Sequence, residues 1–427
     1  MIESTESRGP GTRRPLVGWV IYDMPAHAYA LMISGVGFPV YFASFVVAGR
    51  GNSDVLWSIA LGLPLLLAGI LGPLLGALAD ASGGRRSLLI AATVACSVAT
   101  ALLVLVGKGD IMLGIGLFAV AHFTHLIAVS IYNSYLSLVT TPSRFARVSG
   151  VAWGLSYFGS LACLLLCLPF TRGGLVPENV TNFTWIFPVT AIFLTLIGVP
   201  AALALPKDRF APARNATTEP RRRIRSTIQT WRRDRSVPTF LLAYYLVNDG
   251  VVTVVFFTAL TFRITYGLDV QEILGLSLLL QLVAIPMTML FGLLGERWSQ
   301  RGALYVALVL WMGVLSLMAS AEGLQGAVAV TLALGVVLGS TQSLFRSLFA
   351  GFVPVERTSE YFGFHTLVGR ASAVLGPLAF GAVSVATGSQ RAAMASLAVF
   401  FILGGVVLAF VRLPAPVDDV RASSNVG

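Results

Sequence analysis

Apolar residues run along this chain in long stretches that short polar segments interrupt from one end to the other. Most stretches reach about 20 residues, the length that an α-helix needs to cross a hydrocarbon core of about 30 Å. A helix also pairs its own backbone polar groups where water is absent. The pattern therefore predicts an all-α polytopic membrane protein with about twelve transmembrane helices. The expected spans are 17–45, 54–79, 87–107, 111–140, 148–170, 184–205, 237–262, 271–294, 303–320, 325–353, 361–387 and 391–412.

A polar segment after the sixth span divides the chain into two halves, and short motifs recur in both halves in the same order. "GALADASGGRRSLL" follows the second span and "GLLGERWSQRGAL" follows the eighth. Parallel repeats of this kind build two pseudo-symmetric six-helix bundles with a substrate site between them near the membrane midplane. The aligned positions are Gly76 with Gly292, Asp80 with Glu296, Arg85 with Arg301, and Asp23 with Asp249. The expected parts are an N-terminal tail at 1–16, bundles at 17–205 and 237–412, a linker at 206–236 and a C-terminal tail at 413–427.

Positive charge is distributed unevenly over the connections between spans. Of the 29 Lys and Arg residues, 22 fall on one set of connections and 4 on the opposite set. Because cytoplasmic loops carry the excess of Lys and Arg, we expect both termini and the linker in the cytoplasm and the chain in the plasma membrane. The same bias accounts for the net charge of +10, so a nucleic-acid partner is not expected. With 11% charged residues the chain lies far below the roughly 25% of a soluble domain.

The linker contains "RRRIRSTIQTWRRDRS", in which Ile224, Ile228 and Trp231 follow helical spacing. One interpretation is a short amphipathic helix that lies on the anionic headgroups of the inner leaflet. A solvated linker is an equally good interpretation. The three cysteines, Cys96, Cys163 and Cys167, lie in apolar runs without a metal-binding or redox pattern. We expect no metal, no cofactor and no enzymatic activity, and a protein that acts as a monomer.

The segment "GALADASGGRR" resembles the signature of the major facilitator superfamily between its second and third spans, and the resemblance extends over the whole chain. It implies a gate at the cytoplasmic ends of the two bundles. A glycine there permits close helix approach, and a carboxylate accepts hydrogen bonds from an arginine or from a facing helix N-terminus. The gate residues that follow from it and its echo are Gly76, Asp80, Arg85, Arg86, Glu296 and Arg301.

Four further motifs resemble the bacterial relatives of the vacuolar amino-acid effluxers linked to autophagy. They are "GWVIYDMPAHA", "IYNSYL", "YYLVNDGVVTV" and "QSLFRSLFAGFVP". Phe345 stands where that family carries the first serine of a Ser-Arg-Ser motif. The resemblance implies an exporter of a small solute.

Ionisable residues within the spans are functional candidates, because each one costs several kcal/mol in a bilayer. His27 lies one helical turn beyond Asp23, so the two side chains share a face and could exchange a proton during transport. A fixed hydrogen-bonded pair is the alternative. We expect the proton-coupling groups to be Asp23, His27 and Asp249.

Arg346 aligns with Asn133 in the repeat, so one half carries a cation where the other carries an amide. Its planar guanidinium suits a carboxylate or phosphate of a substrate. A permanent salt bridge to Asp23 or Asp249 is the alternative. The expected substrate-binding residues are Arg346, Asn133, Tyr132, Asn248 and Asp249.

These residues favour a secondary active transporter that moves a small anionic or zwitterionic, amino-acid-like solute, with protons as the coupling ion. The alternative is a membrane receptor or lipid-handling protein on the same fold. The sequence has no Gly-Lys-Ser/Thr phosphate loop, which argues against transport driven by ATP.

The charge bias predicts the side on which each connection lies. In intact cells, Arg172→Cys should react with a membrane-impermeant maleimide, because its connection belongs to the sparsely charged, external set. The matched variant Arg144→Cys should react only after permeabilisation. Labelling of Arg172→Cys from the cytoplasmic side alone would contradict the assigned orientation.

Overall fold

The computed structural model describes residues 13–47, 53–172, 175, 178–207 and 219–412. Within these residues every regular element is a helix, and twelve helical segments are long and apolar enough to cross a membrane. This confirms the twelve spans that the apolar stretches predict. The terminal tails, apart from residues 13–16, and residues 208–218 of the linker lie outside the described residues.

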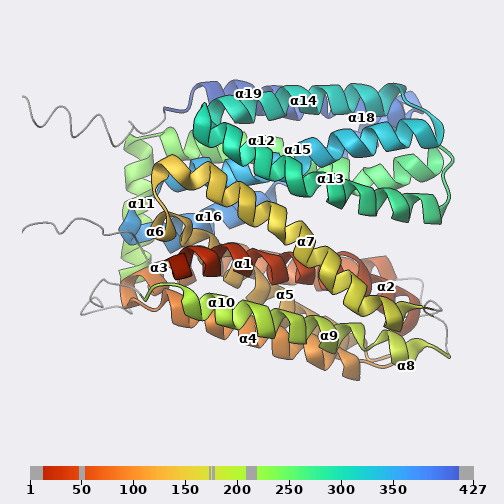
Figure 1. The fold of residues 1–427 in the computed structure, drawn as a ribbon, viewed down its shortest axis with the longest axis horizontal. Coiled ribbons are helices and arrows are strands. Elements are labelled where there is room, and N and C mark those ends of the chain that lie inside the picture. Colours follow the sequence, from red (N-terminus) through yellow and green to blue (C-terminus); the bar gives the residue numbers. More distant parts are fainter. Residues whose placement is uncertain (1–12, 48–52, 173–174, 176–177, 208–218, 413–427) are drawn as a thin grey trace, which may run out of the picture.

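Two helical bundles lie side by side, and the described chain begins and ends at the same end of the molecule (Figure 1). The spans of the first bundle are α1 (Arg13–Tyr29) with its continuation to Val46, α3 (Ser53–Ser82), α4 (Arg85–Leu102), α5 (Ile111–Ser134) with α6 (Leu136–Val139), α7 (Phe145–Thr171), and α9 (Ile186–Phe193) with α10 (Val199–Ala204). Those of the second are α12 (Ser236–Ile264), α13 (Val270–Arg297), α14 (Gln300–Ser320), α15 (Gly323–Phe352), α16 (Thr358–Ala371) with α17 (Leu375–Thr387), and α18 (Gln390–Ser396) with α19 (Ala398–Ala409).

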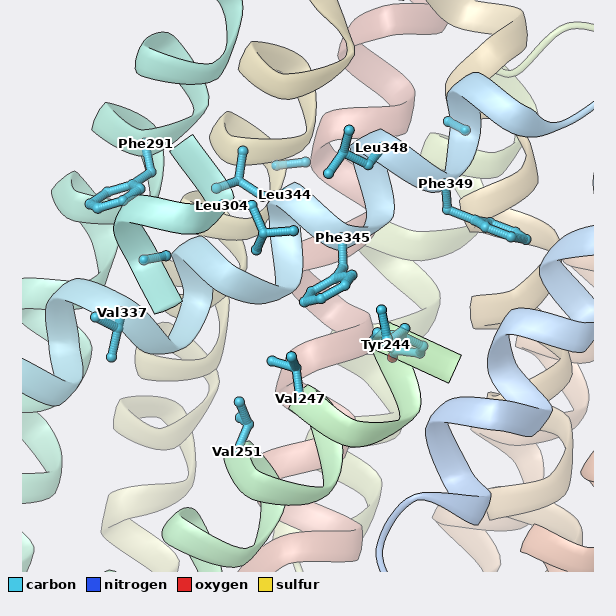
Figure 2. Close-up of a cluster of buried hydrophobic side chains, with 14 of the residues drawn as sticks. Tyr244, Val247, Val251, Phe291, Leu304, Val337, Leu344, Phe345, Leu348 and Phe349 are labelled. Atoms are coloured by element: carbon cyan, nitrogen blue, oxygen red, sulfur yellow. The ribbon is translucent and has the colours of Figure 1, made fainter. Parts of the chain in front are cut away.

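Aromatic side chains fill much of the core of the second bundle. Figure 2 shows Phe345 of α15 beside Tyr244 of α12, with ring centroids 5.3 Å apart. Phe345 also packs edge-on against Phe240, at 5.8 Å. The phenylalanine that departs from the effluxer motif is therefore a core residue, and it holds α15 against α12.

Glycines set the distance between the bundles at two crossings. A Cβ atom at Gly76 of α3 would collide with the backbone carbonyl of Ser359 in α16. A Cβ atom at Gly150 of α7 would lie 2.8 Å from the Cα atom of Gly292 in α13. Backbone therefore meets backbone where α3 crosses α16 and where α7 crosses α13, as is typical of small-residue packing in membranes.

The linker forms the helix α11 (Glu219–Arg233), which lies across the bundle ends on the side of the termini (Figure 1). Trp231 packs edge-on against Tyr361 and Phe364 of α16, at 5.6 and 4.8 Å between ring centroids. Ile228 is exposed. The amphipathic helix is thus present, but Trp231 contacts protein, because α16 offers an aromatic surface at that place.

Candidate functional site

An ion pair buried in the membrane region joins the two bundles. Asp23 of α1 accepts a hydrogen bond from Arg346 of α15 at 2.9 Å, and both side chains are at most 3% exposed. The structure thus selects Asp23, rather than Asp249, as the partner of Arg346. In this low-dielectric setting each charge depends on the other, because an unpaired buried ion costs several kcal/mol.

Arg346 makes further contacts that hold its guanidinium in place. Its Nε atom donates to the hydroxyl of Ser149 at 2.9 Å, and a terminal nitrogen donates to the Ser149 carbonyl at 2.9 Å. The side-chain oxygen of Asn133 accepts a longer bond of 3.3 Å. Trp19 and Trp153 lie with their ring centroids 4.9 Å from the guanidinium carbon. In this conformation Arg346 is enclosed by protein and is not available to a solute.

Three stacked aromatic residues, Trp19, Tyr22 and Tyr132, lie next to this ion pair. Tyr132 stacks on Trp19 at 4.9 Å and on Tyr22 at 5.0 Å, and its ring centroid lies 5.8 Å from the guanidinium carbon of Arg346. Tyr132 is fully buried. Its position therefore favours support of the ion pair through cation–π contact over direct contact with a substrate.

The ion pair lies closer to the terminal side than the expected midplane site. Arg346 is six residues before the end of α15 at Phe352, which corresponds to about 9 Å of helix rise. His27 lies one turn farther from that side, with its Nδ1 atom 3.5 Å from the Asp23 carboxylate. The His27 side chain is 27% exposed, against 3% for Asp23. His27 is therefore the more exposed member of this pair.

Asn248 and Asp249 hold a break in the eleventh span rather than facing Arg346. Between α16 and α17, residues 372–374 form a turn in the middle of the span. The Asn248 amide donates to the carbonyl of Gly369 at 3.0 Å, near the end of α16. An Asp249 oxygen accepts from the N–H of Gly376 at 2.9 Å, in the first turn of α17. The pair therefore satisfies backbone groups that a broken helix leaves exposed in the membrane.

Asp80 also binds the N-terminus of a helix in the other bundle. Its carboxylate accepts hydrogen bonds from the N–H groups of Ser359 at 3.2 Å and Glu360 at 3.1 Å, in the first turn of α16. Arg85 donates to the same carboxylate at 2.6 Å and also reaches the carbonyl of Val355 at 3.1 Å. A carboxylate at a helix N-terminus is stabilised by both the free N–H groups and the helix dipole.

The aligned residues of the second half, Glu296 and Arg301, are arranged differently. Glu296 lies 3.7 Å from Arg147 of α7 and does not pair with Arg301. Arg301 donates to the last carbonyls of the twelfth span, including Leu408 at 2.9 Å. Arg86 reaches the corresponding end of the sixth span, at the Leu205 carbonyl. Arg301 is therefore the structural counterpart of Arg86, and the alignment of Arg301 with Arg85 was off by one residue.

Two residues that hold the site in place could not be identified from the sequence. Ser149 donates its hydroxyl to the carbonyl of Ser343 at 2.8 Å while it accepts from Arg346. Gln342 donates to the side-chain oxygen of Asn248 at 2.7 Å. Serine and glutamine are common within spans, so only the three-dimensional contact distinguishes these two residues from packing residues.

Solved structures of transporters of the major facilitator superfamily share this arrangement of helices. The human organic anion transporter MFSD10 has a TM-score of 0.72 at 15% identity, covering 94% of this chain and 100% of that chain. The proton:xylose symporter XylE has a TM-score of 0.70 at 13% identity, covering 94% and 95%. FucP in the outward conformation has a TM-score of 0.67 at 13% identity, covering 94% and 98%. These likenesses show that the chain has the same fold as these transporters.

The family within that class follows from the sequence comparison. The family described as "Vacuole effluxer Atg22 like" matches residues 52–144 and 140–417, and the chain belongs to this family. The uncharacterized MFS-type transporter YxiO of Bacillus subtilis is 27% identical over 407 residues, covering 92% of this chain and 94% of YxiO. Autophagy-related protein 22 of Cryptococcus neoformans is 23% identical over 287 residues, covering 61% of this chain and 50% of that protein.

The contacts of Asp80 predict that its carboxylate stabilises closure of the bundles on the terminal side. In Asp80→Asn the bundles should separate there, because the neutral amide loses most of its attraction for Arg85 and for the α16 N-terminus. Spin labels at Arg144 and Arg297, one in each bundle, should move apart, while labels at Arg172 and Gln271 should approach each other in pulsed dipolar spectroscopy.

Asp234→Asn is the matched control, because Asp234 is an exposed carboxylate on the same side whose partner is the N–H of Ser236. Its label distances should equal those of the wild type. Unchanged distances in Asp80→Asn would assign Asp80 a purely local role.

Proposed function

We propose that this protein is a secondary active transporter that exports a small anionic or zwitterionic, amino-acid-like solute across the plasma membrane in exchange for protons. The observation that carries the proposal is the buried ion pair between Asp23 and Arg346, because it connects the moving bundles through a group that can be neutralised by one proton. The family resemblance supports an amino-acid-like solute, and the charge bias supports cytoplasmic termini.

The hydrogen bonds between the bundles suggest which state the structure represents. The described contacts of Asp80, Ser149 and Arg346 with the opposite bundle lie in the half of the spans nearer the termini. In our proposal the bundles are therefore closed toward the cytoplasm. His27, partly exposed above Asp23, offers the route by which a proton from the external side reaches the carboxylate.

The proposed cycle uses that proton to change the state of the bundles. Protonation of Asp23 removes the charge that holds Arg346, so the cytoplasmic ends separate and the solute binds from inside. The negative charge of the bound solute then compensates the positive charge left between the bundles and favours release of the proton to the cytoplasm. When the ion pair forms again, the cytoplasmic side closes and the solute leaves on the external side. Each step follows from the requirement that a buried arginine keep an opposite charge nearby.

Loss of either ion-pair partner should abolish driven transport. In proteoliposomes with an imposed pH gradient, Asp23→Asn and Arg346→Ala should lower the accumulation of a labelled amino-acid mixture by about tenfold or more, since removal of one buried partner costs about 3–5 kcal/mol. The neutral double variant Asp23→Asn with Arg346→Gln should recover thermal stability relative to the single variants and remain uncoupled. Counterflow of the same label separates binding from coupling.

Arg391→Ala is the matched control, because it removes an exposed ion pair with Glu322 of 2.9 Å near the opposite end of the spans. It should transport at the wild-type rate. Full pH-driven accumulation in Asp23→Asn would make the carboxylate structural and the coupling scheme wrong. If the wild type moves no solute under the pH gradient or in counterflow, the receptor or lipid-handling alternative would be favoured.

His27 should tune the pH dependence without being essential. Its imidazole faces the Asp23 carboxylate at 3.5 Å and the Trp153 ring at 4.9 Å between centroids. His27→Gln removes a proton relay but leaves the ion pair, so transport should persist with a shifted pH profile. The measurement is the initial rate of uptake between pH 5 and 8. An unchanged profile would exclude His27 from the proton route.

A further inference from the structure

Arg370 is another arginine within the spans, and its surroundings are the opposite of those of Arg346. It lies at the centre of the eleventh span, Val355–Thr387, near the end of α16. Arg346 is 2% exposed and donates to three different residues, whereas Arg370 is exposed. Among the residues that the structure describes, none forms a hydrogen bond or an ion pair with Arg370. A charge at this depth without a partner is a functional candidate by default.

Helix capping does not account for this arginine. A cation near a helix C-terminus is favoured by the dipole, and Arg370 stands in the last turn of α16. The arginines that do cap helix ends in this protein bind carbonyls directly. Arg301 binds Leu408 at 2.9 Å, and Arg86 binds Leu205 at 3.3 Å. Arg370 makes no such bond to a described residue, and the carbonyl of Gly369 beside it is taken by Asn248.

The charge of Arg370 lies near the boundary between the bundles. Its charge acts on the imidazoles of His122 and His125, which belong to α5 of the first bundle. It also acts on Tyr244 of α12. Arg370 is nonetheless exposed, so the protein does not enclose its side chain. The Nδ1 atom of His122, in a side chain that is 5% exposed, has no hydrogen-bond partner among the described residues.

We propose that Arg370 binds the anionic group of the transported solute, a carboxylate or a phosphate, at the centre of the membrane, with His122 on the opposite bundle as a second polar contact. This inference rests on the proposed transport function and names the binding residue for it. Arg346, which the sequence favoured, is already paired and enclosed in this state. A planar guanidinium with free N–H groups can receive a bidentate oxyanion without first breaking a protein contact.

The broken helix places Arg370 suitably for this role. Discontinuous spans near the midplane are where transporters of this kind form their solute sites. The backbone next to Arg370 is fixed by the bond from Asn248 to Gly369, and Asn248 is itself held by Gln342 at 2.7 Å. The arginine is therefore attached to a rigid point in the span, while its side chain stays exposed.

Chemical modification tests whether Arg370 is open and whether anions occupy it. The purified full-length protein is treated with phenylglyoxal, which modifies accessible guanidinium groups, and peptides containing Arg370 and Arg346 are quantified by mass spectrometry. The probes are L-alanine against L-alaninamide, succinate against succinamide, and inorganic phosphate. Arg370 should react and Arg346 should not. At least one carboxylate or phosphate should slow the Arg370 reaction severalfold, and the amides should not.

Variants then assign the binding to this side chain. The protecting anion should raise the melting temperature of the wild type. That shift should be lost in Arg370→Gln and reduced in Arg370→Lys, because lysine keeps the charge but lacks the paired N–H donors of the guanidinium. Arg263→Gln is the matched control, because Arg263 is an exposed arginine within a span whose guanidinium donates to the Leu268 carbonyl at 2.9 Å. It should leave the shift unchanged.

Several results would overturn the site. They are an unreactive Arg370, protection by none of the anions, protection by the amides equal to that by the anions, and an unchanged shift in Arg370→Gln. These outcomes are distinct from failure of the transport proposal. An anion that binds through Arg370 but is never accumulated under a pH gradient leaves the site intact and refutes transport. Transport that depends on Asp23 but not on Arg370 would support the transport proposal and refute the site at Arg370.

Discussion

The constraint on which the structure depends is that a buried arginine must keep an opposite charge close by. Arg346 and Asp23 come from different bundles and meet where water is excluded, so their attraction is screened little. Any movement that separates the bundles at this point must first supply a proton, a solute anion or water to one of the two charges. The aromatic rings of Trp19 and Trp153 make that exchange selective, because they leave little space for water beside the guanidinium.

The two halves show how a duplicated scaffold can diverge. Asp23 and Asp249 occupy matching places in the repeat, yet one joins the bundles and the other stabilises a helix break within its own bundle. The break itself has no counterpart, because α7, the fifth span, is continuous from Phe145 to Thr171 while the eleventh span is divided into α16 and α17. The first half thus contributes the carboxylate of the ion pair, and the second half contributes Arg346 and Arg370.

The fold could be predicted almost entirely from the sequence, because span length and backbone pairing in lipid leave few alternatives. The site could be predicted only in part. Sequence identified Asp23 and Arg346 as candidates, but the choice of Asp23 over Asp249 depends on how each helix is rotated, which spacing along one chain does not determine. Arg301 was misaligned by one residue because two adjacent arginines, Arg85 and Arg86, look equivalent until their directions are known. The sequence does not distinguish Arg370 from Arg346, because the difference between them is that Arg370 is exposed and Arg346 is buried.

The glycine crossings have a consequence for the kinetics of opening. Where Gly76 faces Ser359 and Gly150 faces Gly292, the atoms in closest contact belong to the backbone of both helices. Two such surfaces can part without rotamer changes, so apolar friction between the bundles should be low. The charged contacts of Asp80 and Arg346 are then the directional ones that must break when this end opens. A few charged contacts can break in a single step, whereas an interface of interdigitated side chains would have to separate residue by residue.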